Sequence, residues 1–134
     1  MEFVTQKLVI PSAFENMRFV EAFLLDVKSG YSIPEGTFIR IRGALTEAAN
    51  NAIRHGNKFD PAKKVEILLD IHREKHFCFT VQDEGNGFDY QSVVDPLYGL
   101  MSGSGRGIST IIALADSAIF SGNGNKLEIC FVLY

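Results

Sequence analysis

The chain has 134 residues, of which 46% are hydrophobic and 22% are charged. This length predicts a single folded domain spanning residues 1–134, because it provides for one hydrophobic core but not for two. The net charge of −3 argues against direct binding of nucleic acid, which usually requires a basic face. The apolar stretches are far shorter than the ~20 residues that a membrane-spanning helix needs, so no membrane contact is expected.

The two cysteines, Cys78 and Cys130, each lie inside a strand-like segment. Neither belongs to a CxxC motif or stands near paired histidines, so the spacing disfavours a zinc site. Two thiols of the buried type and the absence of a signal-peptide pattern indicate a reducing cytoplasm.

The first part of the chain predicts a strand followed by a helix. Hydrophobic patterning indicates the strand over residues 3–10 and the helix over residues 13–27. Ser12 and Glu15 form a capping-box pattern at the start of that helix. Residues 29–30, a Ser-Gly pair, are expected to end it.

A second helix is expected from Glu35 to about His55, with Gly56 and Asn57 as its stop signals. Two strands are expected next, at residues 65–71 and 76–83, followed by a loop at 91–101 and a third helix at 108–115. The chain then continues with a strand at 117–121, a hairpin turn at 122–125 and a last strand at 127–133. This order predicts an α/β (α+β) two-layer sandwich, in which a mostly antiparallel sheet carries helices on one face.

The second helix contains a group of polar residues that could serve a nucleotide. Glu47, Asn51 and His55 are four residues apart, so on a regular helix they lie within an arc of about 80°. Asn51 offers an amide oxygen that suits Mg²⁺, and Glu47 offers a carboxylate that could accept the proton of an attacking hydroxyl group. A mid-helix Asn is unfavourable without a role, although Asn50 beside it weakens this point. A solvated helix face, with His55 at the helix C-terminus, is the simpler interpretation.

A second motif, Asp83-Glu84-Gly85-Asn86-Gly87, follows the strand at 76–83. Alternation places Asp83 on the side of the core residues, where an acid needs a partner or a ligand. Its carboxylate could accept a hydrogen bond from an exocyclic amine such as that of adenine, and Gly85 would let a flat ring approach the backbone. An ordinary turn is the simpler interpretation of this motif.

A third motif leads into the third predicted helix. Gly103, Gly105 and Gly107 leave backbone N–H groups that could bind an anion at the helix N-terminus, and Arg106 adds positive charge. The segment is not a P-loop, and Ile108 stands where a GxGxxG motif would have its last glycine. A flexible surface loop is the alternative, but together the three motifs would supply metal, base, adenine and phosphate contacts for one nucleotide.

In this order, the motifs resemble those of the GHKL (Bergerat-fold) ATPases. Residues 47–55 match the N box, residues 83–87 match the G1 box, and residues 105–108 match the second glycine box. The Glu-x-x-x-Asn-Ala-x-x-His-Gly pattern and the Gly-Arg-Gly start of the last helix are similar to those of the RsbW/SpoIIAB-type anti-sigma-factor serine/threonine-protein kinases. The resemblance covers nearly the whole chain.

The resemblance implies a cytoplasmic protein that binds Mg-ATP, sequesters a sigma factor and phosphorylates a STAS-domain anti-sigma-factor antagonist. It implies that Glu47 is the catalytic base and that Asn51 holds Mg²⁺. It implies nucleotide contacts for Asn51, His55, Asp83, Gly85, Gly87, Gly103, Gly105, Arg106, Gly107 and Ile108. It also implies a homodimer and a partner contact at Arg18, for which a solvated helix arginine is the alternative.

The chain departs from the family pattern before its last strand. The family often has a Gly-Thr pair there, whereas this chain has Gly124-Asn125-Lys126. The missing hydroxyl could cost one contact in the adenine pocket, or Asn125 could replace it.

Other functions are also consistent with the sequence. One is a nucleotide-gated protein-binding module without significant kinase activity, which would not need a base at Glu47. A fold without any nucleotide would leave the glycines and the polar helix face unexplained. An interface on the outer face of the predicted sheet is a further alternative, since apolar side chains lie there among polar ones at Leu68, Cys78, Cys130 and Val132.

Overall fold

The computed structural model describes residues 3–86 and 103–133, so Gly87 and the predicted loop at 91–101 lie outside the described residues. The strands are β1 (Phe3–Pro11), β2 (Lys64–His72), β3 (His76–Gln82), β4 (Ser117–Ser121) and β5 (Lys126–Val132). The helices are η1 (Phe14–Asn16), α1 (Met17–Tyr31), α2 (Glu35–Asn51), η2 (Ala52–Gly56) and α5 (Gly103–Leu114).

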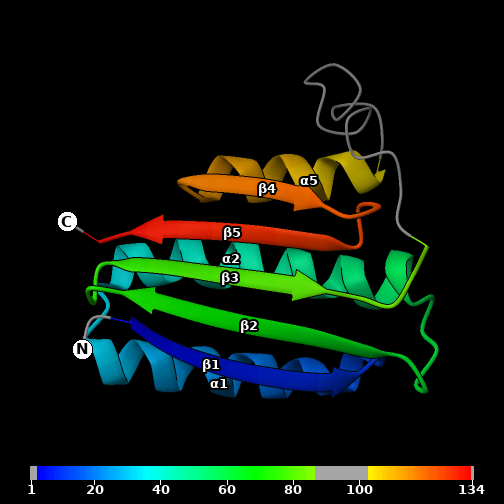
Figure 1. The fold of residues 1–134 in the computed structure, drawn as a ribbon, viewed down its shortest axis with the longest axis horizontal. Coiled ribbons are helices and arrows are strands. Elements are labelled where there is room, and N and C mark those ends of the chain that lie inside the picture. The colour runs from blue at the N-terminus through cyan, green and yellow to red at the C-terminus, as the bar shows by residue number, and fades with distance from the viewer. Residues whose placement is uncertain (1–2, 87–102, 134) are drawn as a thin grey trace.

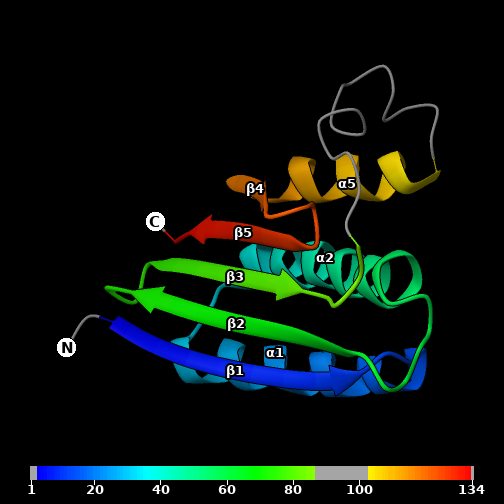
Figure 2. The same ribbon diagram turned by 45° about the vertical axis from the view of Figure 1, so that its right-hand side comes forward.

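The strands form one five-stranded sheet in the order β1-β2-β3-β5-β4, and every neighbouring pair is antiparallel. Helices α1, α2 and α5 lie side by side against one face of this sheet, with α2 in the middle (Figures 1 and 2). The arrangement confirms the predicted two-layer sandwich. In the described parts of the chain, no helix has the length and apolar content needed to cross a lipid bilayer.

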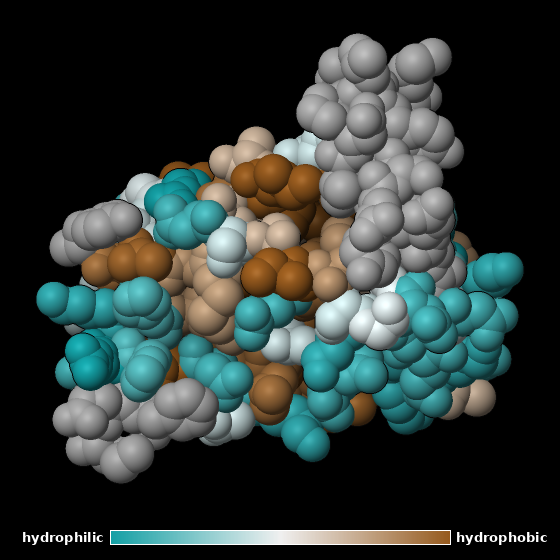
Figure 3. Space-filling view, turned by 45° about the horizontal axis from the view of Figure 1, so that its top comes forward, coloured by the Kyte–Doolittle hydropathy of each residue, from teal (hydrophilic) through white to brown (hydrophobic). Residues whose placement is uncertain are grey.

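The core lies between the sheet and the helices. Alternate residues of β2, β3 and β5 are buried, as the period of two predicts. They pack against the apolar sides of α1 and α2, and the largest fully buried side chains include Phe77, Phe79, Phe131, Leu24, Ile41 and Leu45. The opposite face of the sheet has no helix over it among the described residues, and Figure 3 shows polar and apolar residues exposed together on this side.

The first helix differs from the prediction at both ends. It begins with the short η1 turn, and the Ser12 hydroxyl donates to the carbonyl of Lys63 (2.7 Å) instead of capping the helix. The predicted capping box is therefore wrong. The helix also continues through Ser29 and Gly30 to Tyr31, and Ser32 caps its C-terminus in a left-handed conformation with φ of 51°.

The second helix changes its winding before it ends. Its α-helical part stops at Asn51, and Ala52–Gly56 form a π-helical turn in which the amide of Asn57 donates to the carbonyl of Ala52 (2.8 Å). The advance of about 100° per residue assumed for His55 therefore does not hold beyond Asn51. Single π turns are frequent at functional sites.

The glycine-rich segment is helical, whereas the sequence predicted a loop leading into a helix at residue 108. α5 begins at Gly103, so residues 103–107 are already its first turns. α5 packs closely on α2, because a Cβ atom added to Gly43 of α2 would lie only 2.8 Å from Cδ1 of Leu114. The side chain of Arg40 secures this pair of helices by donating from Nε to the carbonyl of Leu114 (2.9 Å).

The two cysteines do not remain the separate thiols that the sequence predicts. Cys78 of β3 and Cys130 of β5 are cross-strand partners with a Cα–Cα distance of 4.1 Å, and a disulfide joins them. Both are partly buried on the sheet face opposite the helices. The strand register, which the spacing of cysteines along the chain does not reveal, brings them together.

Candidate functional site

A polar pocket lies between the C-terminal end of α2 and the start of α5. Its volume is about 240 Å³, below the ~300–1,000 Å³ typical of pockets that enclose a small molecule. The described walls therefore suit part of a nucleotide, such as its phosphates, better than the whole ligand. The lining residues are Glu47, Asn50, Asn51, Arg54, His55, Gly107 and Thr110.

The predicted base and metal ligand face the glycine of the other helix. A Cβ atom added to Gly107 would lie 3.1 Å from Oε2 of Glu47 and 3.1 Å from Nδ2 of Asn51. Glycine at this position therefore leaves room directly beside both polar groups. Carboxylate and amide oxygens are hard donors of the kind that Mg²⁺ prefers, so the donor set fits this ion.

The pocket includes residues that the sequence did not single out. Asn50, whose presence weakened the argument for Asn51, also lines the pocket, together with Arg54 and Thr110. Thr110 lies three residues after Gly107, so helical spacing could have identified it. The guanidinium of Arg54 lies 5.7 Å from the ring centroid of Phe14, and it supplies a positive charge near the carboxylate and amides.

The turn after β3 meets the other end of the α2–η2 segment. A Cβ atom on Gly56 would lie 2.2 Å from Oδ2 of Asp83, and one on Gly85 would lie 2.2 Å from the carbonyl oxygen of Gly56. Both positions thus require glycine because of close contact. Gly56 follows His55 directly, so Asp83 lies at the edge of the same site without lining the polar pocket itself.

A buried asparagine holds this turn in place. Asn57 is only 1% exposed, and its Oδ1 accepts a hydrogen bond from the amide of Glu84 (2.8 Å). Its Nδ2 donates to Oγ of Ser12 (2.7 Å) and to the carbonyl of Lys64 (2.9 Å). The amide of Lys64 donates in turn to the Glu84 carboxylate. Asn57, expected only to stop a helix, therefore ties the Asp83 turn to three other segments.

Burial controls the ionisation of two residues at the site. Burial raises the pKa of the Asp83 carboxyl, although the amide of Gly85, which donates to Oδ1 (2.7 Å), and the charge of Lys63 act in the opposite direction. Burial also lowers the pKa of His55, and the positive charge of Arg54 lowers it further. At neutral pH His55 is therefore a neutral imidazole.

The remaining predicted site residues fall into several groups. Gly103 and Gly105 lie in the first turns of α5, and Ile108 is a buried side chain that does not line the pocket. Gly87 and the side chain of Arg106 are not among the described parts of the structure. Arg18 is exposed on α1, with its guanidinium 4.9 Å from the ring centroid of Phe19.

Asn125 contacts the Asp83 turn through its backbone. The amide of Asp83 donates to the carbonyl oxygen of Asn125 (3.0 Å). The side-chain oxygen of Asn125 instead lies next to Gly122, within the β4–β5 turn. The departure from the family's Gly-Thr pair thus keeps a backbone anchor for Asp83.

Comparison with known proteins identifies the class. The family model of the histidine kinase-like ATPase domain matches residues 10–131, which is most of the chain. The chain therefore belongs to the histidine kinase-like ATPases, and this membership implies that it binds ATP. No curated protein matches the sequence significantly.

A solved structure shares the fold. The RsbU and RsbW domains of Rv1364c from Mycobacterium tuberculosis match with a TM-score of 0.71 and 14% sequence identity. The match covers 97% of this chain and 32% of that one, so this chain spans about a third of its length. At this identity, the likeness establishes the common architecture.

Proposed function

We propose that this chain is an ATP-dependent serine/threonine-protein kinase that acts as an anti-sigma factor in the cytoplasm. In this role, it phosphorylates a STAS-domain antagonist and sequesters a sigma factor as the two partners of a switch. The observation that carries the proposal is the meeting of Glu47, Asn51 and Gly107 in one polar pocket. A carboxylate is not needed merely to hold a nucleotide, so Glu47 favours phosphoryl transfer over simple binding.

The proposed roles follow from the geometry of the pocket. The hydroxyl oxygen of the protein substrate attacks the γ-phosphorus of ATP while Glu47 takes up the hydroxyl proton. The bond between the γ-phosphorus and the bridging oxygen breaks, and ADP leaves. The side-chain oxygen of Asn51 would hold Mg²⁺, which supplies charge neutralisation on the phosphates. Gly107 leaves the phosphates room beside Glu47 and Asn51, and the first turn of α5 would offer them its free backbone N–H groups.

The adenine end of the site is assigned to the Asp83 turn. An ionised carboxylate accepts a hydrogen bond from the exocyclic amine of adenine, and guanine presents an oxygen at that position. Gly85 packs on the backbone of Gly56 without a side chain, which leaves the base room beside the turn. We expect Gly87 and Arg106 to contribute to the same nucleotide, and Arg18 to a protein partner.

The test is transfer of label from γ-labelled ATP, with Mg²⁺, into proteins of the source cell. Wild type is compared with Glu47→Gln and Asn51→Ala, and Glu35→Gln at the exposed start of the same helix is the matched control. We expect Glu47→Gln to lower transfer at least about 100-fold while ATP affinity changes little, since a general base typically contributes 10²–10⁴-fold. One acid-stable labelled protein, unaffected by Glu35→Gln, supports the kinase and identifies its substrate.

Two other results would contradict the proposed kinase activity or the proposed role of Glu47. If ATP binds and no protein is labelled, the chain is a nucleotide-gated binding module, and unphosphorylated partners become the object of the search. If Glu47→Gln abolishes ATP binding as strongly as transfer, Glu47 has a structural role and the proposed base is wrong.

A further inference from the structure

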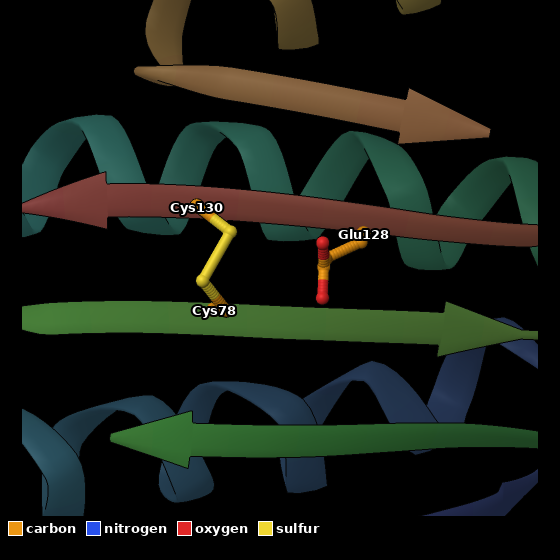
Figure 4. Close-up of side chains that lie close together, drawn as sticks. All are labelled: Cys78, Glu128 and Cys130. Carbon is orange, nitrogen blue, oxygen red and sulfur yellow. A yellow bond between two sulfur atoms is a disulfide. The ribbon is translucent and has the colours of Figure 1, made fainter. Parts of the chain in front are cut away.

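A second group of chemically reactive side chains lies far from the pocket, on the sheet face without helices. Cys78 of β3 and Cys130 of β5 are direct cross-strand partners, and Glu128 stands two residues before Cys130 on the same side of β5. Figure 4 shows the Glu128 carboxylate beside the two sulfur atoms, between β3 and β5. The two Sγ atoms and a carboxylate oxygen all lie within 4.8 Å of one another.

The groups directly opposite these residues carry no positive charge. The cross-strand neighbours of Cys78 are Asp70 and Cys130, and those of Glu128 are Thr80 and Ile119. One basic residue, Lys126, shares this face of β5 two residues before Glu128, but its cross-strand partners are Gln82 and Ser121. Among the described residues, the helices all cover the other side of the sheet, and both cysteines are partly exposed on this side.

The backbone separation also suits a metal once the disulfide is open. Two thiolates on a tetrahedral Zn²⁺ ion lie roughly 3.7 Å apart, given Zn–S bonds of about 2.3 Å. The Cα atoms of Cys78 and Cys130 are 4.1 Å apart, so rotation of the two side chains is enough to separate the sulfurs. Rotation of the Glu128 side chain can then bring its carboxylate to the same ion.

We propose that the reduced protein binds one Zn²⁺ ion per chain through Cys78, Cys130 and Glu128, with water as the fourth ligand. Two thiolates and a carboxylate are ligands that Zn²⁺ accepts, and the mixed set suits it better than Mg²⁺ or Ca²⁺. A thiol or phosphine reductant opens the disulfide by supplying two electrons and is itself oxidised, while each sulfur takes up a proton. Binding of Zn²⁺ then releases these protons to water, so the disulfide and the metal exclude each other.

The test uses Co²⁺ as a spectroscopic substitute for Zn²⁺. Protein is reduced with a phosphine, freed of reductant by gel filtration under argon, and titrated with Co²⁺. We expect one Co²⁺ per chain, a thiolate-to-cobalt charge-transfer band, and loss of that band when Zn²⁺ is added. Any Co²⁺ bound in the nucleotide pocket lacks this band, because the two cysteines are the only ones in the sequence.

Variants and the oxidised protein complete the experiment. Even residues that only support a metal ligand are typically worth 10–100-fold in affinity, so Glu128→Gln should weaken binding at least about tenfold. Cys78→Ser and Cys130→Ser should remove most of the band. Glu66→Gln, which removes another outward carboxylate on neighbouring β2, is the matched control and should leave the affinity unchanged. Circular dichroism checks that each variant is folded.

Three results would overturn the proposal. They are equal Co²⁺ binding by the oxidised protein, one Co²⁺ shared between two chains, and binding without a charge-transfer band. If Glu128→Gln binds Co²⁺ as tightly as wild type, Glu128 is not a ligand of this site. Because the readout is metal binding alone, failure here is separate from failure of the proposed kinase function.

Discussion

Asp83 has an ionisable side chain at a place where burial disfavours its charge. Its carboxylate packs on Gly56 and accepts a hydrogen bond from the amide of Gly85. Its pKa is raised because burial outweighs that hydrogen bond and the charge of Lys63. A group of this kind reduces stability when it is ionised. Its presence is explained if the charged form binds a ligand, which is the proposed contact with adenine.

Asp83→Asn should therefore separate stability from nucleotide binding. With a raised folded pKa, the stabilising contribution of Asp83 is complete below its unfolded value of 3.8 and is lost as pH rises through the folded pKa. The neutral variant avoids this loss, so we expect its melting temperature to equal or exceed that of wild type at pH 7 and the difference to vanish near pH 4. ATP affinity should fall. Thermal melts across this pH range test the sign, and a constant destabilisation at every pH would contradict it.

A substitution at Gly107 should also change ATP affinity without changing stability. Gly107→Ala places a methyl group 3.1 Å from both Glu47 and Asn51, while alanine favours the helix by about 1 kcal/mol. We expect ATP affinity to fall with little loss of thermal stability. The control is Gly36→Ala, also in a helix, where a Cβ atom meets nothing within 4 Å. Equal effects of the two variants on ATP affinity would show that Gly107 does not border the nucleotide.

At the scale of elements, the proposed nucleotide site depends on how four chain segments are joined. Asn57 follows η2, Ser12 follows β1, Lys64 begins β2 and Glu84 follows β3. Their hydrogen bonds form one network around the buried Asn57 and reach the surface at Glu84. The π turn of η2 sets the position of Asn57, because the backbone amide of Asn57 donates to the carbonyl of Ala52, five residues earlier. The network therefore fixes the Asp83 turn relative to the α2 residues of the pocket.

Asn57→Ala should loosen this junction. It leaves the partly buried amide of Glu84 and carbonyl of Lys64 without their partner, and such a group costs less than the roughly 1–3 kcal/mol of a fully buried one, because water can reach it. We expect a loss of roughly 1–3 kcal/mol in the free energy of unfolding, measured with urea, and weaker ATP binding under conditions where the variant is folded. Asn16→Ala is the control, because Asn16 makes a comparable bond to the carbonyl of Pro11 (3.0 Å) at an exposed site. A cost no larger than that of the control would contradict the assigned role.

At the scale of the whole molecule, the periodic elements could be predicted well. The alternation of β2, β3 and β5 and the helical spacing of α1 lead directly to a two-layer sandwich, because long amphipathic patterns leave few alternatives. The helical half of the site could also be predicted, since Glu47 and Asn51 lie one turn apart on regular helix. Their meeting with Gly107 is a contact that the motif order indicated.

The features that could not be predicted depend on contacts distant in sequence. The sequence predicted that Ser12 caps a helix. Its hydroxyl instead donates to the carbonyl of Lys63 and accepts from the side-chain amide of Asn57, both distant in sequence. No local pattern signals the π turn. Cys78 and Cys130 are 52 residues apart, and only the register of β3 with β5 shows that they are neighbours.

Binding of ATP should stabilise the entire domain. A ligand that binds only the native state contributes about 2.7 kcal/mol at a concentration 100 times its dissociation constant. For a chain of this size, we expect Mg-ATP to raise the melting temperature on the order of 10 °C. Mg-GTP should raise it much less, because the Asp83 carboxylate would face an oxygen. An equal effect of both nucleotides would contradict the assignment of Asp83 to adenine.

The disulfide should also affect the stability of the whole fold. In the chain-entropy model, a link across 52 residues stabilises a protein by about 4 kcal/mol. We expect reduction in metal-free buffer to lower the urea midpoint of the oxidised protein, while a Cys78→Ser/Cys130→Ser double variant does not respond to reductant. If reduction changes nothing, the cross-strand link does not form in solution.

The direction of the strands has a practical consequence. Phe3 pairs with His72, His72 with His76, and His76 with Val132, so both ends of the described chain reach one end of the sheet. Asp83 follows β3 at the opposite end, where η2 and the start of α5 also lie (Figure 1). An affinity tag, a fluorescent protein or a surface tether attached at either end of this chain would therefore stand clear of the polar pocket, and immobilised protein should remain accessible to ATP.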